Sequence, residues 1–196
     1  MSKLSVLSPR VKSMLIPSAQ SNTLLTVVAQ ADFVLTDPIT GKVYAYETLG
    51  RYKWLLAVMF AGGLRVSEAL SISSSDIFGN GQIRIRAAKG SLDKVIRVPE
   101  LVQFLDKCRS TGMSPFSDIS RFQVYRMFKQ HSIGSTFGKV GNESVTHYPR
   151  KVYAQLIHNN TNDMAIVQRS VGHVSQKSTE YYVKTKQSNS KKGNSK

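Results

Sequence analysis

The chain has 196 residues, of which 41% are hydrophobic and 20% charged, so it can bury a domain core without disulfides or a structural metal. Lys and Arg number 27 against 12 Asp and Glu, and this net charge of +15 favours a polyanionic partner (DNA, RNA or an anionic membrane surface) over a basic surface kept only for solubility. The lone Cys108 excludes an internal disulfide, and the absence of a long apolar stretch or a signal-peptide core predicts a cytoplasmic protein without membrane contact.

The N-terminal half is expected to start with an arm and to continue in helices. Residues 1–22 contain prolines and several serines, which predicts a flexible basic arm. Residues 23–36 are predicted to form a helix, followed by a turn at a proline and a glycine. A second helix is expected over residues 46–60 and is broken by the glycine pair 62–63; a third is expected over residues 67–73.

A β-hairpin is predicted in the middle of the chain. Residues 82–88 alternate polar and apolar side chains, as a half-buried strand does. Residues 94–98 form the expected returning strand, and Lys89 lies in the turn between them.

The rest of the chain is expected to be helical up to a disordered basic tail at residues 187–196. The fold class is therefore mainly α with a small antiparallel β-hairpin (α+β), in one domain over residues 23–186. The further helices are predicted at residues 100–109, 121–130, 147–158, 163–171 and 178–186.

Basic side chains occur at positions suited to binding a phosphate. Arg65 follows the glycine pair, and Glu68 lies three residues on, so that on a helix its carboxylate can orient the guanidinium. Lys89 lies at the predicted hairpin tip, where an ammonium can reach a phosphate or a leaving oxygen. Each feature alone is more typical of a surface ion pair or a solvated turn lysine, so only the combination points to a phosphate site.

The C-terminal half adds histidines, an arginine and a tyrosine in a regular order. His147 and Arg150 are three residues apart and share one helical face, where histidine can move a proton and arginine can grip a phosphate. His173 follows a helix-ending glycine, and Tyr182 comes nine positions later, next to Tyr181. A phenol becomes a nucleophile only where positive charges favour its deprotonation.

These segments resemble the tyrosine recombinase (phage integrase) family. The matching stretches are GLRVSEAL, AAKGSLDKVIRVP, the HYPR box and GHVSQKSTEYY, and they span about residues 45–186. The resemblance implies the catalytic-domain fold of that family, of the compact type that inverts fimbrial promoter segments. It also implies a site-specific recombinase or integrase of DNA that needs no cofactor and no metal.

The resemblance implies a role for each residue of the pattern. Arg65 and Arg150 would clamp the scissile phosphate, with Glu68 supporting Arg65, and His173 would donate a hydrogen bond to a phosphate oxygen. Tyr182, preferred over its neighbour on spacing, would attack the phosphorus and give a 3′-phosphotyrosyl enzyme. The remaining roles are proton transfer by His147 and protonation of the leaving 5′ hydroxyl by Lys89.

The chain departs from the family pattern at Pro149 and in the region that precedes the catalytic segments. Pro149 stands where leucine is usual, which suits a first helical turn. Only about 45 residues precede the catalytic region, whereas many relatives carry a separate DNA-clamping domain. The expected partners are double-stranded DNA, further copies of the chain in a tetrameric synapse, and an accessory DNA-bending protein. The protein is expected to be associated with the nucleoid or to be encoded by a virus or mobile element.

Two other functions fit the same fold. A non-cleaving DNA-binding regulator would keep the fold without the chemistry, and the intact residue set argues against it. A type IB topoisomerase-like relaxase would share the phosphotyrosine intermediate, but the short chain fits a recombinase better.

Overall fold

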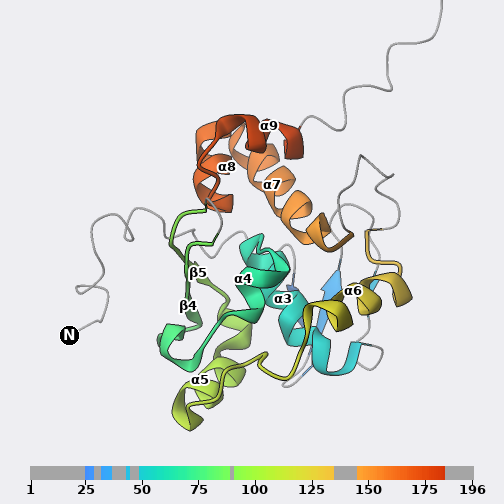
Figure 1. Ribbon diagram of the computed structural model, residues 1–196, viewed down its shortest axis with the longest axis vertical. Helices are drawn as coiled ribbons and strands as arrows, with labels where there is room; N and C mark the ends of the chain where they lie inside the picture. The colour runs from blue at the N-terminus through green and yellow to red at the C-terminus, as the bar shows by residue number, and fades with distance from the viewer. Residues whose placement is uncertain are drawn as a thin grey trace, which may run out of the picture.

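The protein is described here from a computed structural model that covers residues 25–28, 32–36, 43–44, 49–88, 91–134 and 145–183. Its body is mostly helical with a small two-stranded antiparallel sheet, which confirms the predicted fold class (Figure 1). Within these residues no helix is long and apolar enough to cross a membrane. The predicted arm at 1–22 and tail at 187–196 lie outside the described residues.

The N-terminal segment corrects one prediction, because residues 23–36 do not form a helix. They hold strands β1 (Leu25–Val28) and β2 (Asp32–Thr36), which pair antiparallel with Leu25 opposite Leu35. Strand β3 (Val43–Tyr44) joins the other edge of β2. The β-branched run at Thr26, Val27 and Val28 restricts side-chain rotation in a way that favours a strand over a helix.

Helix α3 (Lys53–Gly62) forms the centre of the main core and follows the 3-10 turn η3 (Gly50–Tyr52). Its side chains are buried on all sides, and the predicted helix over 46–60 is confirmed where the chain is described. The helix ends at Gly63, whose φ of 58° is left-handed. A Cβ atom there would lie 2.4 Å from Cδ1 of Tyr153, so only glycine lets the two segments approach this closely.

After two residues the chain enters helix α4 (Val66–Leu70), and the 3-10 turn η4 (Ser74–Asp76) follows. The helix predicted over 67–73 therefore exists but ends earlier. The predicted hairpin is confirmed as β4 (Gln82–Ile85) and β5 (Lys94–Arg97), with buried Ile83 opposite buried Ile96.

The C-terminal helices are confirmed within a few residues of their predicted bounds. The elements are η5 (Pro99–Leu101), α5 (Val102–Thr111), α6 (Arg121–Gln130), η6 (Val145–His147), α7 (Tyr148–Thr161), α8 (Met164–Val171) and α9 (Gln176–Val183). Helix α7 packs against α3, α8 and α9 (Figure 1). A second, smaller hydrophobic core lies among α7, α8 and α9, and the candidate site lies where the two cores meet.

Candidate active site

Arg65 is held by Glu68 through two hydrogen bonds. Its backbone is extended at the start of α4, and its N–H donates to Oε2 of Glu68 at 2.9 Å. Its guanidinium Nη1 donates to Oε1 of the same carboxylate at 2.6 Å. The side chain of Arg65 keeps 27% of its surface exposed, while Glu68 keeps 2%. The predicted contact therefore exists, and it leaves part of the Arg65 side chain exposed.

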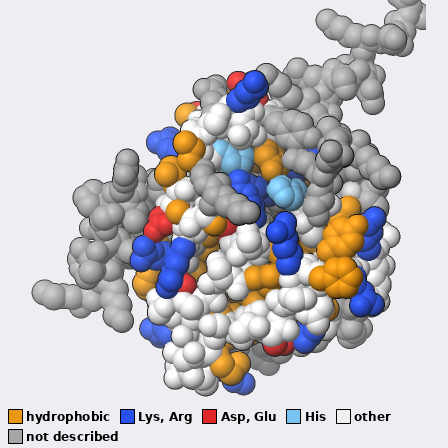
Figure 2. Space-filling model, viewed as in Figure 1, with side chains coloured by type: hydrophobic (Ala, Val, Ile, Leu, Met, Phe, Trp, Pro, Cys, Tyr) orange, Lys and Arg blue, Asp and Glu red, His pale blue; other side chains and the backbone are white. Residues whose placement is uncertain are grey.

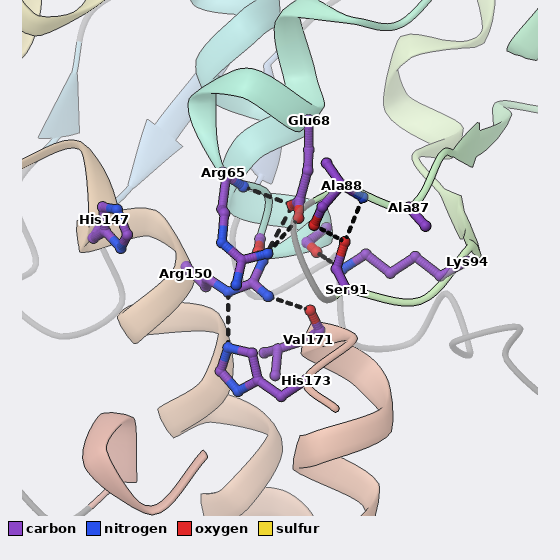
Figure 3. Close-up of polar contacts among 12 residues, drawn as sticks. Arg65, Glu68, Ala87, Ala88, Ser91, Lys94, His147, Arg150, Val171 and His173 are labelled. Carbon is purple, nitrogen blue, oxygen red and sulfur yellow. Dashed lines mark hydrogen bonds and ion pairs between the residues drawn. The ribbon is translucent and has the colours of Figure 1, made fainter. Parts of the chain in front are cut away.

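The Glu68 carboxylate also binds a second arginine. Nη1 of Arg150 on α7 lies 3.1 Å from Oε2 of Glu68 (Figure 3). Burial raises the pKa of the Glu68 carboxyl, but Arg150 and the backbone N–H of Arg65 outweigh that effect and hold the pKa below its usual value. Glu68 is thus a buried carboxylate that fixes two guanidinium groups side by side.

Arg150 is fully buried at the point where helices α3 and α8 end. It donates to the carbonyl oxygens of Gly63, at 2.9 Å, and of Val171. Its Nε donates to Nε2 of His173 at 3.3 Å, the longest of its hydrogen bonds. Four donor contacts therefore tie this guanidinium to two helix ends, the carboxylate and the histidine (Figure 3).

His173 is neutral in this environment. Burial, followed by the positive charges of Arg150 and Arg65, lowers the pKa of its imidazole to about 3. Because Nε2 accepts from Arg150, the ring proton lies on Nδ1, which is 3.1 Å from the hydroxyl oxygen of Thr179. The ring is therefore oriented from both sides.

Tyr182 lies between the two histidines. Its phenol oxygen is 3.2 Å from Nδ1 of His147, and its ring packs at 5.2 Å from the ring of His173. Only 9% of Tyr182 is exposed. The side chain of Tyr181 lies outside the described residues, so the preference for Tyr182 rests on its own surroundings.

The structure thus brings six of the seven predicted residues into one cluster, and Lys89 lies outside the described residues. Two described residues that follow Lys89 in the chain are in contact with the cluster. Ser91 forms an isolated β-bridge with His173, and the Leu92 N–H donates to the Gly172 carbonyl at 3.3 Å. Figure 2 shows His side chains next to Lys or Arg side chains near the middle of the face that is turned to the viewer.

Two residues of the cluster were missed by the sequence analysis. Lys94 is 3% exposed and places its ammonium 2.7 Å from the Gly62 carbonyl and 2.9 Å from the Ser170 carbonyl. Its spacing from Ile96 was a usable signal, because residues two apart on a strand share a face and Ile96 is buried. Thr179 lies three residues before Tyr182, hence on the same face of α9.

The cluster can bind an anion between two oriented guanidinium groups and can move a proton between a phenol and an imidazole. Among the described residues, no group of three or more His, Cys, Asp and Glu side chains is placed to hold a metal ion. The single cysteine, Cys108, is buried on α5, and burial raises the pKa of its thiol.

Comparison with known proteins identifies the family of the chain. Residues 44–189 match the model of the phage integrase family. Tyrosine recombinase XerA from Pyrococcus furiosus is 27% identical over 150 residues, covering 68% of this chain and 50% of XerA. XerA from Pyrococcus horikoshii is 25% identical over 164 residues, covering 76% and 56%. The chain therefore spans about half the length of the curated relatives it matches.

A solved structure supports the fold. The crystal structure of XerA recombinase superposes with a TM-score of 0.55 at 20% sequence identity, covering 89% of this chain and 61% of that chain. The helical body and the hairpin described above are thus similar to those of a known recombinase.

Proposed function

Since the chain belongs to the phage integrase family, we propose that it is a site-specific recombinase that cuts and rejoins double-stranded DNA through a 3′-phosphotyrosyl intermediate. One observation carries the proposal: two arginines share the Glu68 carboxylate beside a tyrosine whose hydroxyl contacts His147. Phosphoryl transfer depends chiefly on such positioning and charge stabilisation.

The scissile phosphate would bind between Arg65 and Arg150. The Arg65 side chain is partly exposed, and its ion pair with Glu68 would keep the guanidinium from rotating away. Arg150 has little free surface, so the phosphate would replace its longest contact, the 3.3 Å hydrogen bond to His173. Both guanidinium groups would then stabilise the charge that builds up on the phosphate oxygens in the transition state.

His173 would change its hydrogen-bond role when the phosphate arrives. With Arg150 turned to the phosphate, Nε2 of His173 is free to carry the proton and donate to a phosphate oxygen. Nδ1 would then accept from the Thr179 hydroxyl, which can serve as donor or acceptor. Thr179 would thus hold the ring in place in both tautomers.

Cleavage would follow by attack of the Tyr182 oxygen on phosphorus. The phenol proton would pass to Nδ1 of His147, which already lies within hydrogen-bond distance. The new tyrosyl O–P bond would form as the bond to the 5′ oxygen breaks, and Lys89 would give its proton to that oxygen. Religation is the reverse sequence, so the bond energy is conserved and no nucleotide triphosphate is needed.

The finer features belong to the same proposal. We expect residues 23–186 to be the catalytic domain, flanked by a basic arm and a basic tail. Four copies would act on two DNA sites, and an accessory DNA-bending protein would assist them. The proposed setting is the cytoplasm, at the nucleoid or on a mobile or viral element.

A covalent-capture experiment tests the function without knowledge of the DNA site. The protein is incubated with a pool of nicked duplexes of randomised sequence, and DNA that stays attached under denaturing conditions is sequenced. We expect adducts on a defined sequence, abolished by Tyr182→Phe and retained by Tyr181→Phe as the matched control. Binding without adducts on any duplex would instead favour a non-cleaving regulator.

The same preparation separates the recombinase from a topoisomerase-like relaxase. A recombinase leaves supercoiled plasmid lacking the selected sequence unchanged, whereas relaxation of any plasmid with Tyr182-dependent adducts would favour the relaxase.

A further inference from the structure

We propose that Lys94 is a positioning residue of this site: its ammonium joins the ends of helices α3 and α8 to the β4–β5 hairpin and thereby sets the separation of Arg65 and His173. The inference rests on the proposed recombinase function, and it concerns a residue that does not touch the reacting atoms itself.

The contacts of Lys94 connect three separate parts of the chain. It starts strand β5, and its Nζ donates to the Gly62 carbonyl of α3 at 2.7 Å and to the Ser170 carbonyl of α8 at 2.9 Å. Arg65 comes three residues after Gly62, and His173 three residues after Ser170. The ammonium therefore fixes the two helix ends from which the candidate phosphate-binding side chains emerge.

Arg150 makes the same connection one residue further along. Lys94 holds the carbonyls of Gly62 and Ser170, and Arg150 holds those of the next residues, Gly63 and Val171. Both helices end in a left-handed glycine, so these carbonyls belong to their negatively polarised C-terminal turns, which attract cations. Two cations in series thus hold the two helix ends together.

A phosphate that recruits Arg150 would weaken the link that this arginine provides. Lys94 is buried, and its ammonium donates to backbone oxygens only, so a bound phosphate would leave its contacts in place. Its side chain extends from β5 toward the cluster in Figure 3. We infer that Lys94 keeps the helix ends in place while Arg150 turns to the phosphate. The separate roles of Lys94 and Arg150 give a physical reason for a buried ammonium at this position, even though burial of its charge costs desolvation energy that an apolar side chain of similar length would not.

The charge state of Lys94 provides a specific signature. Burial lowers the pKa of its ammonium to about 7, and Arg150 and Arg65 act in the same direction against the opposing carboxylate of Glu68. The ring of Tyr153 on α7 also faces it, 5.8 Å from Nζ. The full charge is therefore present below about pH 7, and it diminishes as the pH rises.

The test compares Lys94→Met with Lys53→Met. Lys53 is also buried, at the start of α3, and its ammonium lies 4.5 Å from the centre of the Trp54 ring. Single-turnover cleavage of the duplex selected by covalent capture is followed from about pH 6 to about pH 9. We expect Lys94→Met to fold and to bind DNA as the wild type does, but to cleave about 10²-fold more slowly, because displaced groups lose rate rather than affinity.

The ratio of the wild-type to the Lys94→Met rate constant should be largest below pH 7 and should decline above it, since the other titrating groups are common to both proteins. Lys53→Met should cleave at the wild-type rate. A ratio near one, or a large ratio that is the same at every pH, overturns the proposal.

Hydrogen exchange tests the inference separately from the proposed function. Hydrogen exchange in the free protein should be faster in Lys94→Met at the amides of Leu64 and His173, which close the two helix ends, and unchanged exchange overturns the proposal. If Lys94→Met does not fold, Lys94→Gln retains donors without the charge and should show the same decline of the ratio with pH. If the wild type forms no adducts, only the recombinase function is refuted. The exchange experiment still tests whether Lys94 holds the ends of α3 and α8 together.

Discussion

Nδ1 of His147 lies 3.2 Å from the phenol oxygen of Tyr182, although the residues are 35 positions apart in the chain. His147 ends the turn η6 just before α7, and Tyr182 lies near the end of α9, so the contact depends on the packing of α9 against α7. An imidazole nitrogen therefore lies within hydrogen-bond distance of the phenol in the protein without DNA.

We predict that His147→Asn lowers the single-turnover cleavage rate by about 10²- to 10⁴-fold, the usual contribution of a positioned acid–base group. DNA affinity measured by fluorescence anisotropy should change little. The matched control is His158→Asn, near the end of helix α7 and more than two turns from the site, which should cleave normally. Equal losses in the two variants would mean that the histidine contact has no special role.

The burial of Arg150 predicts that this residue also stabilises the fold. A phosphate-binding arginine on a surface could be truncated without harm to folding, but Arg150 is fully buried and paired with Glu68. We predict that Arg150→Ala lowers the free energy of unfolding by about 3–5 kcal/mol, since the buried Glu68 carboxylate keeps only Arg65 as a partner and the Gly63 and Val171 carbonyls lose their donor. Urea unfolding measures the change.

Arg51→Ala provides the comparison for that measurement. Arg51 pairs with Asp118 at 3.1 Å, but both side chains are largely exposed, so its loss should change the free energy of unfolding far less than the loss of Arg150 does. Similar values for the two arginines would show that the Arg150–Glu68 pair does not stabilise the fold.

The low pKa of His173 predicts an acid-sensitive fold. Its folded value of about 3 lies below the ordinary 6.5, so between these values the unfolded chain binds a proton that the folded chain does not. The free energy of unfolding should therefore fall as the pH is lowered from 6.5 towards 3, by up to about 1.4 kcal/mol per pH unit from this residue. Unfolding curves of wild type and His173→Gln across this range measure it, and parallel curves would contradict the prediction.

The positive charge of the chain predicts salt-sensitive DNA binding. The logarithm of the binding constant should fall linearly with the logarithm of salt concentration, because each neutralised phosphate releases condensed counterions. Arg65→Ala should reduce the slope by about one unit if Arg65 contacts one phosphate. Anisotropy titrations on a single duplex suffice, and a flat wild-type response would argue against phosphate contacts.

The sequence predicted the helices, the hairpin and most members of the cluster, since periodicity and spacing carry that information locally. It failed at residues 23–36, where β-branched side chains outweighed an apparent helical pattern. It also missed Lys94, because a lysine at the start of a strand is normally solvated. Only the contacts with Gly62 and Ser170, from helices far away in the chain, make it a core residue.

The pairing of Ser91 and Leu92 with His173 and Gly172 has a mechanical consequence. The hairpin turn and the imidazole are joined through backbone atoms, so a force that displaces one is transmitted to the other without any side-chain intermediary. Any displacement of Ser91 or Leu92 when DNA binds would therefore also move the imidazole of His173.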